Sequence, residues 1–566
     1  MSTQLTRAKF LKNALGLTLL SSSSSAAALL LTGCNPPTKR ANQAEGSPNN
    51  GSPQNEETTQ LSPTSLVQHF RSREDLKPPT IEVLTHKQGS SSGGAAAQGA
   101  QGAQGGGEEG YIFCAPKNGP DEASPSQDGA MIFDGRGDLV WFWPLESEEQ
   151  DVMDFKVQSY RGEDVLTFWV GTHTGYGQGE YLILDSSYEE VGRVSAANGY
   201  AGDHHEFLIT PDNTALITIY GEVEGFDLSS MGGSREGKVL DGIVQELDIE
   251  SGELLFEWHS LEHVDLQESY AKVPKESEKW YFDYFHINSI EVDNDSNLLI
   301  SARRTSTIYK VDRTTGDVIW RLGGKKSDFE MGSGTRIAYQ HDARRQDDGT
   351  ITVFDNGDFE VDEQSYGLVL EVDEEKMSVD LLQEYPNPEG KLCATQGSMQ
   401  ILPHTQNAFI GWGSNPLMSE FSREGELLFS ASFPPEVESY RAFRFPWRGE
   451  PQRRRGGRGG GGRGGRGGGR GGGERPALVA ERVGGGEEGL VRAYASWNGA
   501  TEVASWELLG GSDPRRMNPV VEVPREGFET AIEVSTAEPY VGVRARDALG
   551  RVLAYSKPVE LEGRNP

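Results

Sequence analysis

The chain has 566 residues, with 86 acidic against 53 basic side chains and a formal net charge of −33 at pH 7. Such an acidic surface repels phosphate backbones, which argues against nucleic acid as a partner. Only 35% of the residues are hydrophobic, and 71 glycines and 28 prolines separate many short runs of branched and aromatic residues. This composition favours turn-rich all-β structure in a chain long enough for more than one domain.

Residues 1–34 have the pattern of a secretory signal. Arg7, Lys9 and Lys12 precede a weakly apolar stretch that ends in the tetrapeptide LTGC. This tetrapeptide resembles the lipobox of bacterial lipoproteins, which implies cleavage before Cys34 and a lipid on its sulfur. The rest of the chain would then be exported and held at a bacterial envelope membrane, in the periplasm or at the cell surface. An ordinary cleaved signal with an incidental cysteine is the alternative.

Three further stretches have low complexity. Residues 35–63 are rich in serine, proline, asparagine, glutamine and glutamate, a composition typical of a disordered tether. Residues 89–107 are rich in glycine and indicate an insertion. Residues 451–475 hold eight arginines and one glutamate in a glycine-rich run. Because this run lies in an exported acidic chain, a flexible insertion is a better interpretation than RNA binding.

The segment from residue 64 to residue 450 repeats one pattern six times. A short apolar run, an aspartate or serine, a turn that usually contains glycine and a second apolar run recur at intervals of 49 to 64 residues. Each copy predicts a β-hairpin, and an interval of this length holds two hairpins, hence one four-stranded blade. Six copies predict a six-bladed β-propeller. The anchor residues are Asp134, Asp185, Asp248, Asp312, Asp373 and Ser422.

Histidine begins three of the intervening hairpins, at His205, His286 and His341. The first strand of each propeller blade lines the central channel, so equivalent positions of successive blades meet around one axis. We therefore expect these three side chains to converge. The second strand runs antiparallel to the first, so its end returns to the same mouth and brings Arg303 or Arg304 close to the histidines. The turn at residues 355–357 returns in the same way.

A single histidine at the start of a strand is most often structural, but three in register beside an arginine favour a functional cluster. His204 and His173 have no equivalent in the other repeats, so we interpret them as structural. The chain has no serine-nucleophile motif, phosphate loop or dinucleotide fingerprint. A neutral imidazole is itself a nucleophile, and an arginine or a second, protonated imidazole can neutralise an anionic group during its transfer. These residue types predict group transfer from an anionic ester.

Two long segments carry a family resemblance. YFDYFHINSIEVDNDSNLLISARRTSTIYKVDRTTGDVIWRLGGKKSDF, from Tyr281, and QHDARRQDDGTITVFDNG, from Gln340, strongly resemble arylsulfotransferases. Members of this family are described as transferring sulfate from a phenolic sulfate ester to a phenolic acceptor. Their route is a ping-pong reaction through a sulfohistidine that uses no nucleotide sulfate donor. The resemblance implies a small aryl sulfate and a phenol as partners, and neither a cofactor nor a metal.

The resemblance also implies roles for individual residues. His341, in the Gln-His-Asp segment, would be the nucleophile. His286 and His205 would bind sulfuryl oxygens or protonate the leaving phenoxide. Arg303 is the simplest match for the family's arginine, with Arg304 possible after a shift of one residue. The residues predicted to contact the substrate are Asn288, Arg304, Asp355 and Asn356.

The C-terminal part, residues 476–566, contains roughly seven short alternating segments separated by turn residues. This pattern predicts a small fibronectin- or immunoglobulin-like β-sandwich, which is found in a variant of the family. The other two cysteines, Cys114 and Cys393, are too few for a disulfide framework, and the sequence leaves their pairing open.

Two other functions are compatible with the sequence. Three histidines can form a facial zinc or iron site, which would make the protein a metal enzyme. Propellers also serve as scaffolds, so the cluster could instead belong to a non-catalytic propeller that binds an anionic ligand or other envelope proteins.

Overall fold

The computed structural model describes most of the chain after residue 65. The expected signal, the tether, the glycine-rich insertion, Cys34 and nearly all of the arginine-glycine run lie outside the described residues. Within the described part of the chain, no helix is both long and apolar enough to cross a membrane. The described residues are 66–87, 110–119, 124–147, 149–451, 475–483 and 489–561.

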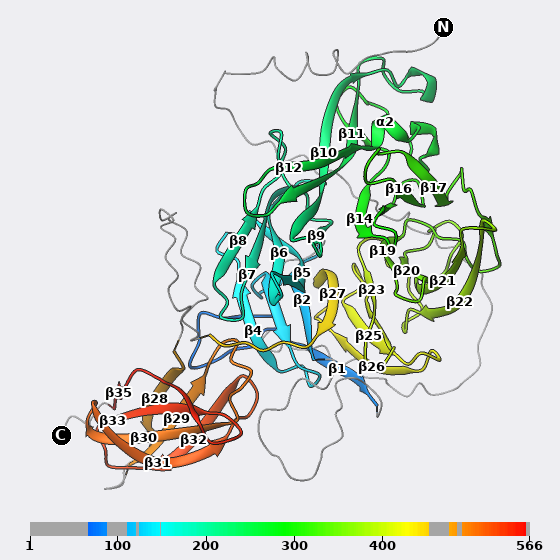
Figure 1. Cartoon of the computed structure of the whole chain (residues 1–566). Coiled ribbons are helices and arrows are strands. Elements are labelled where there is room, and N and C mark those ends of the chain that lie inside the picture. The colour runs from blue at the N-terminus through cyan, green and yellow to red at the C-terminus, as the bar shows by residue number, and fades with distance from the viewer. Residues whose placement is uncertain are drawn as a thin grey trace, which may run out of the picture. The chain divides into compact units, whose positions relative to one another are not determined.

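The structure is almost entirely β (Figure 1). Between Glu82 and Phe445, the described residues form six sheets of four or five strands, which we call the body. In pairing order, the first sheet contains β27 (Val437–Phe445), β2 (Tyr111–Asn118), β3 (Gly129–Phe133) and β4 (Leu139–Pro144). The second sheet contains β5 (Asp151–Tyr160), β6 (Glu163–His173), β7 (Gly177–Leu184) and β8 (Glu190–Val194). The third sheet contains β9 (Phe207–Ile209), β10 (Thr214–Phe226), β11 (Gly237–Asp248) and β12 (Leu254–His259), and β13 (Tyr281–Asp283) pairs in parallel with β11.

The remaining three sheets of the body follow the same plan. The fourth sheet contains β14 (Ile287–Val292), β15 (Leu298–Ala302), β16 (Thr307–Val311) and β17 (Val318–Gly323). The fifth sheet contains β19 (His341–Arg345), β20 (Ile351–Asp355), β21 (Tyr366–Asp373), β22 (Ser378–Pro386) and β18 (Glu330–Met331). The sixth sheet contains β23 (Ser398–Ile401), β24 (Ala408–Gly411), β25 (Leu417–Phe421), β26 (Leu427–Ser432) and β1 (Glu82–His86). Short helical turns join some strands: η2 (Ser229–Met231), α2 (Ser260–His263) and η3 (Leu266–Glu268).

The six predicted hairpins are confirmed, and each forms the third and fourth main strands of a sheet: β3–β4, β7–β8, β11–β12, β16–β17, β21–β22 and β25–β26. The anchor residue explains why the pattern recurs. Asp134, for example, accepts hydrogen bonds from the backbone N–H of Arg136 and Asp138, and Asp312 accepts them from Thr314 and Thr315. A short acidic side chain that caps its own turn fixes the hairpin locally.

Strands from the two ends of the body join sheets formed by the opposite end. β27 pairs with β2 although more than 300 residues separate them, and β1 pairs with β26. Among the innermost strands, β5 contacts β27 and β9, β19 contacts β14 and β23, and β23 contacts β27. Figure 1 shows these strands at the centre of the body, with the other strands of each sheet outside them.

A layer of buried charges lies between the innermost strands. Arg441 on β27 lies 2.8 Å from Asp154 on β5 and 3.2 Å from Glu206. Its other terminal nitrogen donates to the carbonyl oxygen of Asn288 at 2.9 Å and lies 3.5 Å from Asp342. We call this set the central ion layer; its members are Asp154, Lys156, Glu206, Asp342, Arg344 and Arg441.

The C-terminal part forms two sheets around a shared apolar core that includes Val491, Trp506 and Ile532. Its described residues contain eight strands, one more than the roughly seven segments that the sequence suggested. They are β28 (Ala477–Val483), β29 (Leu490–Ser496) and β32 (Glu529–Ser535), and β31 (Arg516–Pro524), β30 (Ser505–Asp513), β33 (Tyr540–Arg546), β34 (Val552–Tyr555) and β35 (Val559–Glu560).

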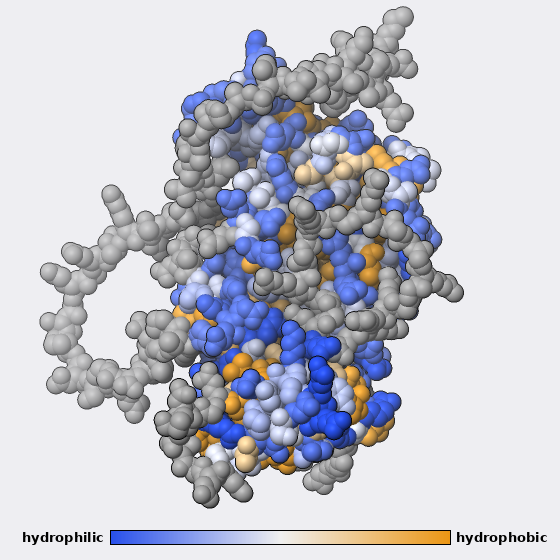
Figure 2. Space-filling view, turned by 90° about the vertical axis from the view of Figure 1, so that its left-hand side faces the viewer, coloured by the Kyte–Doolittle hydropathy of each residue, from blue (hydrophilic) through white to orange (hydrophobic). Residues whose placement is uncertain are grey.

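The composition left open whether Cys114 and Cys393 pair and how polar the surface is. Cys114 and Cys393 are both buried and free, so they do not pair. On the face shown in Figure 2, hydrophilic residues predominate and apolar residues occur in small patches, as expected for a strongly acidic chain.

Replacing Arg441 by methionine should lower the free energy of unfolding by about 3–5 kcal/mol, because it leaves buried carboxylates without a counter-charge. Chemical denaturation measures this difference. The control is Arg193→Met, because Arg193 pairs with Glu180 and Glu190 at the surface. Removing these exposed ion pairs should lower the free energy of unfolding by about 1 kcal/mol or less. Equal effects of the two substitutions would contradict the importance of the central ion layer.

Candidate functional site

The structure brings the three repeat-equivalent histidines together. His205 lies two residues before β9, His286 directly precedes β14 and His341 begins β19. The ring centroids of His205 and His286 are 5.0 Å apart, in an edge-to-face arrangement. His341 is close enough that a positive charge on either of the other two rings would lower its pKa.

Unusual backbone conformations place these side chains. His286 and Asp342 have φ values of 56° and 53°, in the left-handed region that non-glycine residues seldom adopt. The pairing of β19 with β20 shifts register between His341 and Arg344, so β19 carries a bulge at the site. A bulge lets neighbouring side chains serve different purposes. Here His341 takes part in the histidine cluster, while Asp342 joins the central ion layer.

A hydrogen bond from Asn356 determines which nitrogen of His341 can react. The Nδ2 group of Asn356 donates to the carbonyl oxygens of Cys393 and Gln396, both at 2.9 Å. Its Oδ1 atom therefore faces His341 Nδ1, at 2.6 Å, and can only accept a hydrogen bond. The proton of neutral His341 is thus assigned to Nδ1, which leaves a lone pair on Nε2.

The other two histidines have carboxylate partners. His205 Nδ1 bonds to Asp203 Oδ1, and His286 Nδ1 bonds to Asp283 Oδ2. A carboxylate stabilises the protonated form of a neighbouring imidazole, whereas an amide does so far less. His205 and His286 are therefore better suited than His341 to hold a second proton.

Burial lowers the pKa of all three histidines, but to different degrees. For His341, the positive charge of Arg303 adds to burial, and the pKa lies well below the ordinary value. For His205 and His286, burial is the largest effect and the adjacent carboxylate opposes it, so the pKa of each falls less strongly. At neutral pH the cluster therefore contains a neutral His341.

Both predicted arginines lie beside the cluster. Arg303 is buried; it donates to the carbonyl oxygen of Ala394 at 2.8 Å, and its guanidinium lies over the ring of Tyr339, 5.2 Å from the centroid. Arg304 lies 3.8 Å from the carboxylate of Asp283. Because Arg303 lowers the pKa of both His341 and His286, it is the arginine whose charge acts on the nucleophile candidate.

Two of the residues predicted to contact substrate have backbone partners in the structure. Asp355 accepts hydrogen bonds from the N–H groups of Ala338 and Gly357, at 2.7 and 3.3 Å. Asn288 donates to the carbonyl oxygen of Gln340 at 2.6 Å. These contacts fix the backbone of the segment before His341 and of the turn around Asn356. They therefore help to position the side chains of His341 and Asn356.

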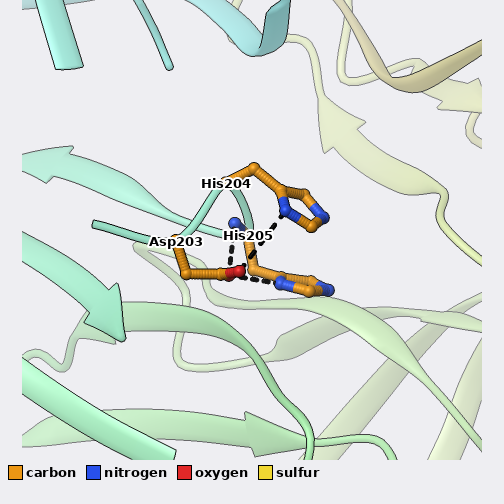
Figure 3. Close-up of side chains that lie close together, drawn as sticks. All are labelled: Asp203, His204 and His205. Atoms are coloured by element: carbon orange, nitrogen blue, oxygen red, sulfur yellow. Dashed lines mark hydrogen bonds and ion pairs between the residues drawn. The ribbon is translucent and has the colours of Figure 1, made fainter. Parts of the chain in front are cut away.

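His204 and His173, which the sequence led us to interpret as structural, lie next to the cluster. The ring of His204 lies 4.0 Å from that of His205 and 4.8 Å from that of His173, as measured between centroids. Figure 3 shows the carboxylate of Asp203 facing both His204 and His205. The Asp-His-His run was a visible signal, but repeat alignment excluded its first histidine.

This same region matches a known protein family. Residues 156–434, which contain His205, His286, Arg303 and His341, match the family described as arylsulfotransferase (ASST). Over this range the chain belongs to the arylsulfotransferase family. Membership indicates sulfotransferase activity and, with it, aryl sulfates and phenols as substrates. No curated protein matches the chain.

Several solved structures are similar to this arylsulfotransferase-family chain at low identity. A protein of unknown function from Bacteroides caccae is 11% identical, with 59% of this chain and 98% of that chain covered and a TM-score of 0.34. An inactive virginiamycin B lyase from Staphylococcus aureus is 7% identical, with 63% and 89% covered and a TM-score of 0.31. The Dos1 propeller is 14% identical, with 53% and 65% covered and a TM-score of 0.28.

Asp355 allows a test of its supporting role through pH. Burial raises the pKa of its carboxyl to about 7 in the folded protein, against about 4 in an unfolded chain. The wild type should therefore lose stability as the pH rises from about 4 to about 7. Asp355→Asn keeps the acceptor oxygen and removes this ionisation. Thermal unfolding at pH 5 and pH 8 should show the variant gaining a few degrees on the wild type at the higher pH; a constant difference would contradict this.

Proposed function

We propose that the protein is a nucleotide-independent aryl-sulfate sulfotransferase that works by a ping-pong reaction through a sulfohistidine at His341. The observation that carries the proposal is the pairing of His341 with the fixed amide of Asn356, which leaves Nε2 as a neutral nucleophile. Family membership over residues 156–434 supports the class of reaction.

In the first half-reaction, the Nε2 lone pair of His341 attacks the sulfur of the aryl sulfate. The bond between sulfur and the phenolic oxygen breaks, and its electron pair leaves with the phenoxide. Protonated His205 or His286 gives its proton to that oxygen, and its carboxylate partner fixes the ring. The guanidinium of Arg303 offsets charge on the sulfuryl oxygens. Asn356 keeps accepting from Nδ1–H of the sulfated ring.

In the second half-reaction, a phenol takes the place of the departed phenoxide. Its proton returns to the imidazole that gave one up, and its oxygen attacks the sulfur. The bond between sulfur and nitrogen breaks, and the electron pair returns to Nε2 of His341. The resting state of the site is thereby restored, without a cofactor.

We also propose an architecture and a location for this enzyme. The six sheets are the blades of one propeller, a reading that the closing pairs β27–β2 and β1–β26 support. Residues 476–566 form the fibronectin- or immunoglobulin-like sandwich, supported by two sheets around one core. A lipid on Cys34 would hold the exported protein at a bacterial envelope membrane; the LTGC tetrapeptide supports this.

His341→Ala should abolish transfer, with a loss of about 1,000-fold or more, because no other group forms the covalent intermediate. The assay is release of nitrophenolate from 4-nitrophenyl sulfate, with and without phenol, by protein lacking residues 1–34. Release that depends on phenol supports transfer rather than hydrolysis. His404→Ala, at an exposed turn, is the control. An active His341→Ala variant would overturn the proposed nucleophile.

Asn356→Asp should make activity acid-sensitive. The new carboxylate would still accept from Nδ1–H but would raise the pKa of His341, so that protonation removes the nucleophile as the pH falls. Once the raised pKa of His341 exceeds 6, the ratio of activity at pH 6 to that at pH 8 should drop roughly tenfold for each further unit. The control is Asn198→Asp, which adds the same charge at the surface. Superimposable profiles of Asn356→Asp and wild type would contradict this assignment.

A metal enzyme is the second candidate, because one ligand atom each from Asp203, His204 and His205 lies within 4.8 Å of the others. Elemental analysis of the purified protein tests it: a stoichiometric metal whose removal abolishes activity would favour this function. Tight anion binding without turnover would instead favour a non-catalytic propeller.

A further inference from the structure

Three imidazole rings form a continuous contact from the surface to the proposed acid–base residue. His173, at the end of β6, is exposed, whereas the side chains of His204 and His205 are each only 5% exposed. Ring centroids are 4.8 Å apart from His173 to His204 and 4.0 Å apart from His204 to His205. The repeat pattern of the propeller requires only the last of these rings.

One carboxylate links the inner two rings. Asp203 Oδ1 bonds to His205 Nδ1, and Asp203 Oδ2 lies 3.4 Å from His204 Nδ1 (Figure 3). Asp203 is fully buried and also accepts from the backbone N–H of Gly177. A proton on either ring would therefore remain next to the same negative charge.

The surroundings keep His204 and His173 neutral at rest. Burial is the largest effect and lowers the pKa of His204 to about 4. Asp203 and Lys117 are charged groups that act on both His204 and His173, and Glu438, which pairs with Lys117, also acts on His173. The rings of Trp169 and Tyr440 also lie next to His204, and neither titrates near neutrality. Neutral imidazoles in sequence can accept a proton at one nitrogen and release one from the other.

We propose that His204 and His173 are relay residues that carry a proton between His205 and solvent during sulfuryl transfer. The inference rests on the proposed function. It assigns His173 as the point at which the proton leaves to solvent. His286 also contacts His205, but it is one of the groups that would hold the sulfuryl group, so substrate covers it during turnover.

Proton balance shows when such a path is needed. If the leaving phenoxide takes a proton from His205 and the acceptor phenol gives one back, the proton is recycled. 4-Nitrophenolate is a weak base that leaves without a proton at about pH 8. The net reaction is then aryl sulfate plus phenol giving nitrophenolate, phenyl sulfate and one proton. That proton arrives on a buried His205 and has to leave before His205 can accept another.

The test compares two donors in His173→Ala and His204→Gln at about pH 8. With 4-nitrophenyl sulfate, the first burst of nitrophenolate should match the wild type, because that half-reaction needs no proton. Steady-state turnover should fall roughly tenfold or more, and added imidazole should restore it in His173→Ala. With phenyl sulfate as donor and 1-naphthol as acceptor, where the proton is recycled, turnover should match the wild type.

Other outcomes separate the two claims. If the wild type transfers sulfate but both variants equal it with 4-nitrophenyl sulfate, the relay is wrong and the transferase stands. If turnover falls equally with both donors and imidazole restores neither, the two histidines only support the fold, which also overturns the relay. A wild type inactive with every aryl sulfate would defeat the proposed function itself.

Discussion

The buried guanidinium of Arg441 is the contact on which the geometry of the body depends. It lies on β27, the strand that closes the first sheet, and it reaches carboxylates or carbonyls on strands of three other sheets. Burial disfavours the charge on Glu206, but Arg344, Arg441 and Lys156 outweigh this and lower its pKa. Because Glu206 follows His205 and Asp342 follows His341, the same ion pairs fix the backbone from which both histidines project.

The three histidines of the cluster differ in their hydrogen-bond partners, and this difference gives them different chemical roles. His341 faces an amide that can only accept, whereas His205 and His286 face carboxylates. Burial acts on all three, so the remaining contrast in pKa comes from these partners and from Arg303. One cluster can thus contain both a nucleophile and proton donors, although its reactive groups are chemically identical.

Prediction from sequence worked where interactions are local. The anchor aspartates cap their own hairpins within a few residues, which is why the repeat was visible and the six hairpins were placed correctly. The grouping of His205, His286 and His341 followed from that repeat. His204 was interpreted as structural because it has no counterpart in other repeats. That Asp355 accepts from backbone N–H groups could not be predicted, because a carboxylate that caps a nearby loop looks the same in sequence as one that binds a ligand.

The sequence by itself determined the β-hairpin repeats, the register of the three histidines and the resemblance that identifies the family, since each depends on residues close together in the chain. Only the tertiary structure decided which nitrogen of His341 keeps its lone pair, which arginine acts on it, that the cysteines stay apart, and that His204 and His173 touch the site. Those features depend on burial and on contacts between distant strands, and neither is encoded in the spacing of residues along the chain.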